Sequence, residues 1–284
     1  MPATPFRHLY EALKKAGKAD MGSKAVAELL MQLTAASHEF LLGSDAVDLT
    51  SSVKDKKYFS FRREYLSRPI NQALFVTDSH EVVERLAALE AHDLEHFKGE
   101  EAARTLYTLA MSFCAANDVS KGGDKKTPAT FFETLIGHLF AAHLGVNPTN
   151  AIEVLGGDLK GSLPTDFIFD MGAKKVKYHV PIKLSTRERV IQVWAHQRVV
   201  DGVYGFGRYK GVLVCLTETK LDTGKLEVTE ICLPDQWRIY EMYVAHMTRI
   251  YYLDPPAKYS ALAEEYPKIE VRPLSHFFSE SGDL

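Results

Sequence analysis

The chain has few cysteines, no long hydrophobic run and no excess of basic residues. It contains three cysteines in 284 residues, and this odd number without metal-type spacing argues against a disulfide framework. No apolar run reaches the ~20 residues that cross a bilayer, and the first twenty residues lack the apolar stretch of a signal peptide. We therefore expect a cytoplasmic protein without a membrane partner.

The balance of charge is close to neutral but unevenly distributed. Lysine and arginine number 34 against 37 aspartates and glutamates, which excludes a generally basic nucleic-acid coat protein. Between Lys174 and Arg198, however, seven basic residues accompany a single acidic residue, Glu188. The chain is acidic on balance and carries one cationic strip.

Apolar residues recur every three and four positions through most of residues 5–120, a pattern typical of amphipathic helices. The predicted helices cover residues 6–17, 23–43, 79–97 and 99–117. The basic and aromatic stretch 54–75 between them is interpreted as a solvated connection, with phosphate contact as the alternative. A further helix is predicted over residues 127–144, with Thr127 as its N-cap, Pro128 in its first turn and Gly145 as its end.

From residue 151 onward the apolar period changes to two, which indicates strands. Strands are predicted over residues 152–157, 166–170, 175–184, 210–221 and 225–233, and helices over 190–205 and 235–253. The predicted fold class is α/β (α+β), with a mixed central β-sheet flanked by helices and a mainly helical N-terminal half. We expect a boundary between a region 1–120 and a region 121–284.

Asp166 and Lys183 are the first candidates for chemistry. Asp166 begins one predicted strand and Lys183 ends the return strand 17 residues later, so a hairpin can bring the two side chains together. A carboxylate there can hold Mg²⁺, and a lysine beside it can orient or deprotonate a water molecule. An ordinary cross-strand ion pair is the alternative for the same pattern.

The triplet Arg187-Glu188-Arg189 follows four residues after that lysine. Arginine makes paired hydrogen bonds to guanine, and glutamate accepts from the amino group of cytosine, so the triplet can read G·C pairs. A solvated first turn of a helix is the alternative. Lys125 and Lys126 in the loop before the predicted helix 127–144 can contact phosphates, but the loop lacks the ending of a nucleotide-binding loop, and no nucleotide cofactor is expected.

Together these motifs resemble the type II restriction endonucleases of the PD-(D/E)XK superfamily, in particular the group that recognises CCGG, CCNGG or CCWGG. The resemblance covers about residues 121–235. It implies that Lys183 is catalytic, that Arg187-Glu188-Arg189 contacts C·G pairs, and that Glu133, 33 residues before Asp166, joins the site from a helix. Asp166 and Glu133 would then be the metal ligands.

The chain departs from this group at one position. The group places a glutamate about thirteen residues after the lysine, where this chain has His196 and Gln197. Either of these two side chains could assist the metal or its water, and Gln192 is a weaker candidate. A neutral residue there leaves fewer negative charges for Mg²⁺, which would make Glu133 more important.

A separate motif points to another chemistry. His92, Glu95 and His96 match HxxEH, which on a helix can place two zinc ligands one turn apart beside a glutamate base. The motif is short, and its surroundings resemble an exposed amphipathic helix, so a zinc metallopeptidase is the less favoured reading.

The sequence thus predicts a type II restriction endonuclease with a nuclease core at 121–284. We expect Mg²⁺-dependent cleavage of double-stranded DNA at a short palindrome containing CC and GG, with 5′-phosphate ends and a homodimer reading the two half-sites. The helical region 1–120 would serve dimerisation or DNA contact. A non-catalytic, sequence-specific DNA-binding protein is the main alternative.

Overall fold

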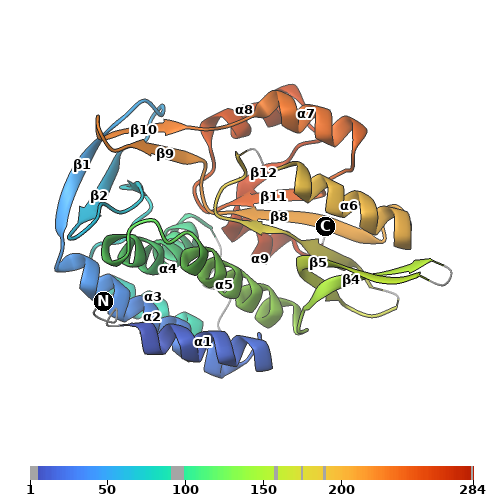
Figure 1. Ribbon diagram of the computed structural model, residues 1–284, viewed down its shortest axis with the longest axis horizontal. Coiled ribbons are helices and arrows are strands. Elements are labelled where there is room, and N and C mark those ends of the chain that lie inside the picture. The colour runs from blue at the N-terminus through green and yellow to red at the C-terminus, as the bar shows by residue number, and fades with distance from the viewer. Residues whose placement is uncertain (1–5, 91–98, 157–158, 174, 188–189, 283) are drawn as a thin grey trace.

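A mixed sheet lies between two layers of helices in the computed structural model (Figure 1). The structure describes residues 6–90, 99–156, 159–173, 175–187, 190–282 and 284. Its helices are α1 (Arg7–Ala19), α2 (Lys24–Leu42), α3 (Ser79–Glu90), α4 (Gly99–Ser120), α5 (Lys126–Leu144), α6 (Ile191–Tyr204), α7 (Pro234–Tyr243), α8 (Ala257–Glu265) and α9 (Phe277–Glu280).

The larger sheet has the strand order β12-β11-β8-β6-β5-β4, and β7 pairs with the end of β8. Its strands are β4 (Thr149–Gly156), β5 (Leu159–Asp170), β6 (Lys177–Val180), β7 (Ile182–Lys183), β8 (Tyr209–Cys215), β11 (Arg249–Tyr252) and β12 (Val271–Pro273). β4, β5 and β6 are antiparallel neighbours, whereas β8 runs parallel to β6, β7 and β11. The predicted mixed sheet flanked by helices is therefore confirmed.

Strand β8 is buried on both faces from residue 211 onward, which explains the apolar run of residues 212–215. Val212 and Val214 belong to the core shared with α1, α2, α4 and α5, whereas Leu213 and Cys215 belong to the core under α6, α7 and α8. Successive side chains of a strand point to opposite faces, so this alternation places one helical layer on each side of the sheet. All three cysteines are free.

A second, smaller sheet has the strand order β3-β2-β1-β10-β9. It comprises β1 (Asp45–Ser51), β2 (Tyr58–Arg62), β3 (Ile70–Asn71), β9 (Thr219–Asp222) and β10 (Glu227–Glu230). The interpretation of the stretch 54–75 as a solvated connection was wrong, because it supplies β2 and β3 and buries Tyr58, Phe61 and Ile70. β1 runs parallel to β10, with Thr50 opposite Glu227, so this sheet joins segments far apart in the sequence.

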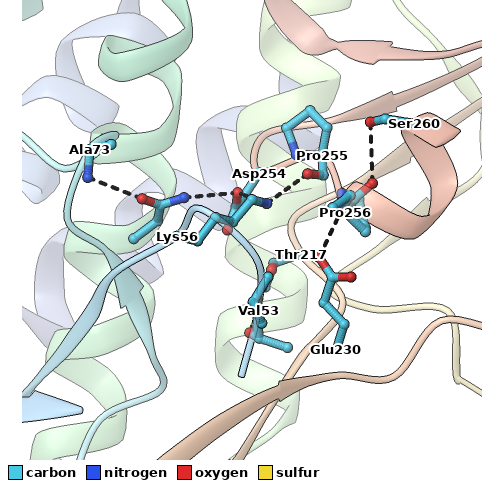
Figure 2. Close-up of polar contacts among 12 residues, drawn as sticks. Val53, Lys56, Ala73, Thr217, Glu230, Asp254, Pro255, Pro256 and Ser260 are labelled. Carbon is cyan, nitrogen blue, oxygen red and sulfur yellow. Dashed lines mark hydrogen bonds and ion pairs between the residues drawn. The ribbon is translucent and has the colours of Figure 1, made fainter. Parts of the chain in front are cut away.

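The buried carboxylate of Asp254 connects the smaller sheet to the end of β11 (Figure 2). Lys56 donates to Asp254 Oδ1 at 2.6 Å and to the carbonyl of Pro255 at 2.7 Å, and Asn71 Nδ2 donates to Asp254 Oδ1 at 3.0 Å. Tyr58 OH donates to the other carboxylate oxygen at 3.3 Å. Because a buried charge is stable only when it is paired, these contacts fix the smaller sheet against the larger one.

Three further local predictions were wrong at particular residues. The predicted helix 235–253 ends at Tyr243, and its last residues form the buried strand β11. The predicted strand 210–221 divides after Cys215 into β8 and β9, which lie in different sheets. Thr127 is not the N-cap of α5, because Asp124 Oδ1 accepts the backbone N–H groups of Lys126 and Thr127 instead.

The division of the chain at residue 120 stays a prediction. Within the described residues, no helix is long and apolar enough to span a membrane.

Candidate active site

Asp166 lies on β5 at the point where its pairing with β6 ends. The last paired residues are Phe167 and Val180, and Pro181, which follows, has no N–H to continue the ladder. The next backbone N–H, that of Ile182, donates to Asp166 Oδ2 at 2.7 Å. The aspartate side chain therefore replaces a backbone partner, which fixes its carboxylate beside β7.

Lys183 lies next to this carboxylate, as the hairpin predicted. Its Nζ donates to Asp166 Oδ2 at 2.8 Å, and both side chains are partly exposed. Oδ1 of Asp166 accepts no hydrogen bond from the described residues. Asp166 and Lys183 line an open pocket of about 450 Å³ together with Thr165, Gln192 and His196. A carboxylate oxygen and an ammonium group thus face the same solvent-accessible space.

Glu133 approaches the pair from α5. Burial, together with the nearby charge of Asp166, raises the pKa of Glu133 to about 7, while the charge of Lys183 opposes the shift. The side chain lines a second hollow on the surface, which it shares with Lys14, Lys18 and Phe167. The predicted helix glutamate therefore lies close enough to Asp166 for their charges to interact.

The donor set suits a hard cation. The described residues contain no group of three or more histidine, cysteine, aspartate or glutamate side chains arranged to hold a metal. Mg²⁺ does not require such a cage, since it is commonly bound through one or two carboxylates and keeps several waters. Asp166 and Glu133 offer two carboxylates whose mutual repulsion a cation between them would relieve. These residues fit Mg²⁺ and offer no sulfur or paired imidazoles for a softer metal.

His196 and Gln197 occupy different environments although they are neighbours in α6. His196 lines the pocket, and its pKa is lowered by burial and by the charge of Lys183. Gln197 is buried: its Oε1 contacts His179 Nδ1 at 2.9 Å and its Nε2 donates to Asp201 at 3.0 Å. The side chain that reaches the Asp166–Lys183 pocket is therefore that of His196.

His179 connects Gln197 to the strand that carries Asp166. Its Nε2 contacts the hydroxyl of Thr165 at 3.0 Å, directly before Asp166. Burial lowers the pKa of His179 to about 4, which keeps the imidazole neutral. Gln197 thus reaches the site only through this hydrogen-bonded chain.

The predicted base-reading triplet begins within the described residues and continues outside them. Arg187 is exposed and has a left-handed backbone with φ of 38°, whereas Glu188 and Arg189 lie outside the described residues. Lys125 and Lys126 are exposed at the start of α5. Lys126 is seven residues before Glu133, about two helical turns, so the two lie on one side of the helix.

One functional candidate was missed by sequence reasoning. Glu218, three residues after β8, is 1% exposed and its carboxylate contacts the segment that precedes Arg187. The available signal was a glutamate two residues after the apolar run 212–216, because a glutamate is seldom buried unless its carboxylate has a partner. His92, Glu95 and His96 of the HxxEH motif lie outside the described residues.

Comparison with solved structures shows which fold this is. The chain superposes on the crystal structure of the type IIP restriction endonuclease Kpn2I with a TM-score of 0.80 and 24% identity, over 97% of this chain and 96% of that one. The structure of restriction endonuclease PspGI with its substrate DNA is a more distant match, with a TM-score of 0.45 and 13% identity over 71% of this chain and 90% of that one. No protein-family model and no curated protein matches the sequence. The first superposition shows a restriction-endonuclease-like fold along nearly the whole chain.

Proposed function

We propose that this protein is a type II restriction endonuclease that cleaves double-stranded DNA with Mg²⁺ at a short palindrome containing CC and GG, such as CCGG or CCNGG. The observation that carries the proposal is the contact between Asp166 and Lys183 at the mouth of a pocket, with Glu133 nearby. The fold shared with Kpn2I, which is a type IIP restriction endonuclease, supports the same activity.

Each side chain has a distinct task in the proposed reaction. Asp166 and Glu133 would hold Mg²⁺, which supplies positive charge against the charge developing on the phosphate and the leaving 3′-oxygen. Lys183 is held by Asp166 at the pocket and orients the attacking water while its charge stabilises the phosphorane-like transition state. The bond to the 3′-oxygen breaks and leaves a 5′-phosphate. His196, which lines the same pocket, would donate or accept a hydrogen bond with that water.

Base recognition would come from Arg187, Glu188 and Arg189, and backbone contact from Lys125 and Lys126. Arginine and glutamate side chains match the major-groove edges of guanine and cytosine. A palindrome has two identical half-sites, so two copies of one triplet require a two-fold symmetric homodimer. Each subunit would then cut one strand.

The test is incubation of the purified protein with a plasmid of known sequence, with Mg²⁺ and with EDTA, followed by mapping of the cut ends. Discrete fragments formed only with Mg²⁺, all ending within sites that contain CC and GG, are expected. Binding to such sites without cutting in any metal would instead favour a non-catalytic DNA-binding protein.

A further inference from the structure

Glu218 is a buried acid with no part in the proposed hydrolysis. It lies in the connection between β8 and β9, is 1% exposed, and does not line the Asp166–Lys183 pocket. Glutamate is rarely buried so fully unless its charge is paired or hydrogen-bonded. The partners of its carboxylate therefore indicate its role.

Those partners include the segment that leads into the base-reading triplet. Glu218 Oε1 accepts the backbone N–H of Thr186 at 2.7 Å and the hydroxyl of the same threonine at 2.7 Å. Tyr252 OH donates to this oxygen from β11 at 2.9 Å. Burial raises the pKa of Glu218, while hydrogen bonds from Thr186, Tyr252 and the backbone of Arg187 oppose that rise. The carboxylate is thus shared between the reading segment and the central sheet.

Arg187 has a backbone conformation that needs such support. Its φ of 38° lies in the left-handed region, which residues with a Cβ adopt uncommonly. Thr186 is buried and fixed on both its N–H and its hydroxyl directly before this residue. Because the backbone at Thr186 is fixed, it sets the orientation of the exposed Arg187 side chain.

Residues 216–217, which directly precede Glu218, form backbone hydrogen bonds with Lys183 and Leu184. Cys215 is opposite Lys183 in the parallel β7–β8 pair, and Leu216 N–H donates to the Lys183 carbonyl at 3.1 Å. Thr217 N–H then donates to the carbonyl of Leu184 at 3.2 Å. Residues 215–217 therefore fix the lysine by backbone hydrogen bonds, and Glu218 extends this line of contacts to Thr186.

The position of Glu218 is itself fixed from two sides. Its carbonyl accepts the N–H of Ile231 at 2.9 Å, just after β10. Leu216, two residues before it, accepts the N–H of Asp254 at 3.0 Å, and Asp254 is the residue that joins the two sheets in Figure 2. The carboxylate consequently projects from a rigid part of the fold.

We propose that Glu218 is a positioning residue for base recognition, which fixes Arg187 in a set position relative to Lys183. This inference rests on the proposed nuclease function and deepens it. Loss of the carboxylate should loosen the segment at Thr186 and Arg187 while Lys183 keeps its own backbone bonds. Discrimination between DNA sequences should then fall more than the rate of cleavage.

The experiment compares three near-isosteric variants on two duplexes. Glu218→Met keeps the approximate length of the side chain and removes both carboxylate oxygens, including the one that accepts from Thr186. Thr186→Val removes only the hydroxyl that reaches Glu218. Tyr252→Phe is the matched control, because it removes one hydrogen bond to the same oxygen without touching the reading segment. For each variant, kcat/KM is measured on the duplex mapped for the wild type and on one with a single C·G pair replaced, and thermal unfolding reports the folded state.

The ratio of the two kcat/KM values is the deciding quantity. One lost bidentate base contact corresponds to about 5- to 150-fold in discrimination, and we expect a fall in this range for Glu218→Met. We expect a smaller fall for Thr186→Val, and a ratio within about twofold of wild type for Tyr252→Phe. A ratio that stays within about twofold of wild type in Glu218→Met would overturn the positioning role. A wild-type protein that cuts no duplex would instead overturn the proposed function, and the inference with it.

Discussion

The ammonium of Lys183 and the carboxylate of Asp166 are in contact at 2.8 Å, on strands that are not paired with each other at this point. Pro181 makes the contact possible, because it ends the β5–β6 ladder and leaves the N–H of Ile182 to the aspartate. The same carboxylate oxygen thus receives a backbone and a side-chain donor. We regard this pair as the centre of the proposed cleavage reaction.

Glu133→Gln should raise the stability of the metal-free protein at alkaline pH while it lowers the cleavage activity. The folded-state pKa of Glu133 is about 7, above its ordinary value of 4.5, so the stability that its neutral form contributes is present below about pH 4.5 and is lost as the pH rises through about 7. In EDTA, the free energy of unfolding of Glu133→Gln should equal that of the wild type near pH 5. At pH 8 it should be larger than that of the wild type by on the order of 1–2 kcal/mol, after allowance for partial exposure. Urea unfolding at the two pH values measures this difference.

With Mg²⁺ at pH 8, the wild type should become more stable than Glu133→Gln. The metal stabilises the ionised carboxylate, so it should raise the unfolding midpoint of the wild type at pH 8 more than that of Glu133→Gln. Cleavage by the variant should fall by at least about a hundredfold. An equal Mg²⁺ effect on both proteins would remove Glu133 from the metal site.

His196→Ala and Gln197→Glu distinguish the two neighbours in α6. His196 faces the pocket, so His196→Ala should slow cleavage by at least about tenfold with little change in stability. Gln197→Glu introduces the carboxylate that the resemblance led us to expect, but its oxygens would face Asp201 and the carbonyl of Tyr209, which now accept from Gln197. We expect destabilisation by about 1–3 kcal/mol in chemical unfolding, without a gain in cleavage. A more active, equally stable Gln197→Glu protein would contradict this placement.

Arg187→Ala should weaken specific binding more than general binding. Its loss should reduce affinity for the mapped duplex by about 1–3 kcal/mol and affect a duplex with a replaced C·G pair far less. Arg198→Ala, an exposed arginine farther along α6, is the charge-matched control. Fluorescence anisotropy in EDTA at fixed salt measures both affinities, since phosphate contacts vary steeply with salt. Equal weakening on both duplexes would assign Arg187 to the phosphate backbone.

The proposed palindrome requires two subunits. Sedimentation equilibrium should give a mass near 63.6 kDa, twice the 31.8 kDa of one chain, at least in the presence of the mapped duplex. A protein that remains monomeric on DNA and still cuts both strands at one site would exclude the two-fold arrangement.

The sequence predicted those parts of the site that depend on local order. Asp166 and Lys183 could be paired from the sequence because alternation and a hairpin turn fix which side chains meet, whereas Glu133 was expected in the site only through the family resemblance. Contacts between distant segments left no local signal. The pairing of β1 with β10 and the burial of Glu218 under Thr186 both join residues more than 30 positions apart.

The two misassigned elements failed for a physical reason. Residues 249–252, RIYY, suit a strand as well as a helix by composition, and burial between β8 and β12 decides in favour of the strand. Likewise, nothing in 210–221 marks the point where the chain leaves one sheet for the other. Gln197 and His196 could not be distinguished from spacing alone, because adjacent helix residues point in directions that only packing reveals.

The most direct test of the account is single-turnover cleavage of the mapped duplex by Lys183→Ala, measured with Mg²⁺ together with its affinity for that duplex in EDTA. Lys177→Ala is the matched control, because Lys177 on β6 forms an ion pair with Asp170 on β5, away from the pocket. We predict that Lys183→Ala binds the duplex with wild-type affinity and cuts it at least about a hundredfold more slowly. Lys177→Ala should have the affinity and the cleavage rate of the wild type. Cleavage by Lys183→Ala at the wild-type rate would contradict the assignment of the active site.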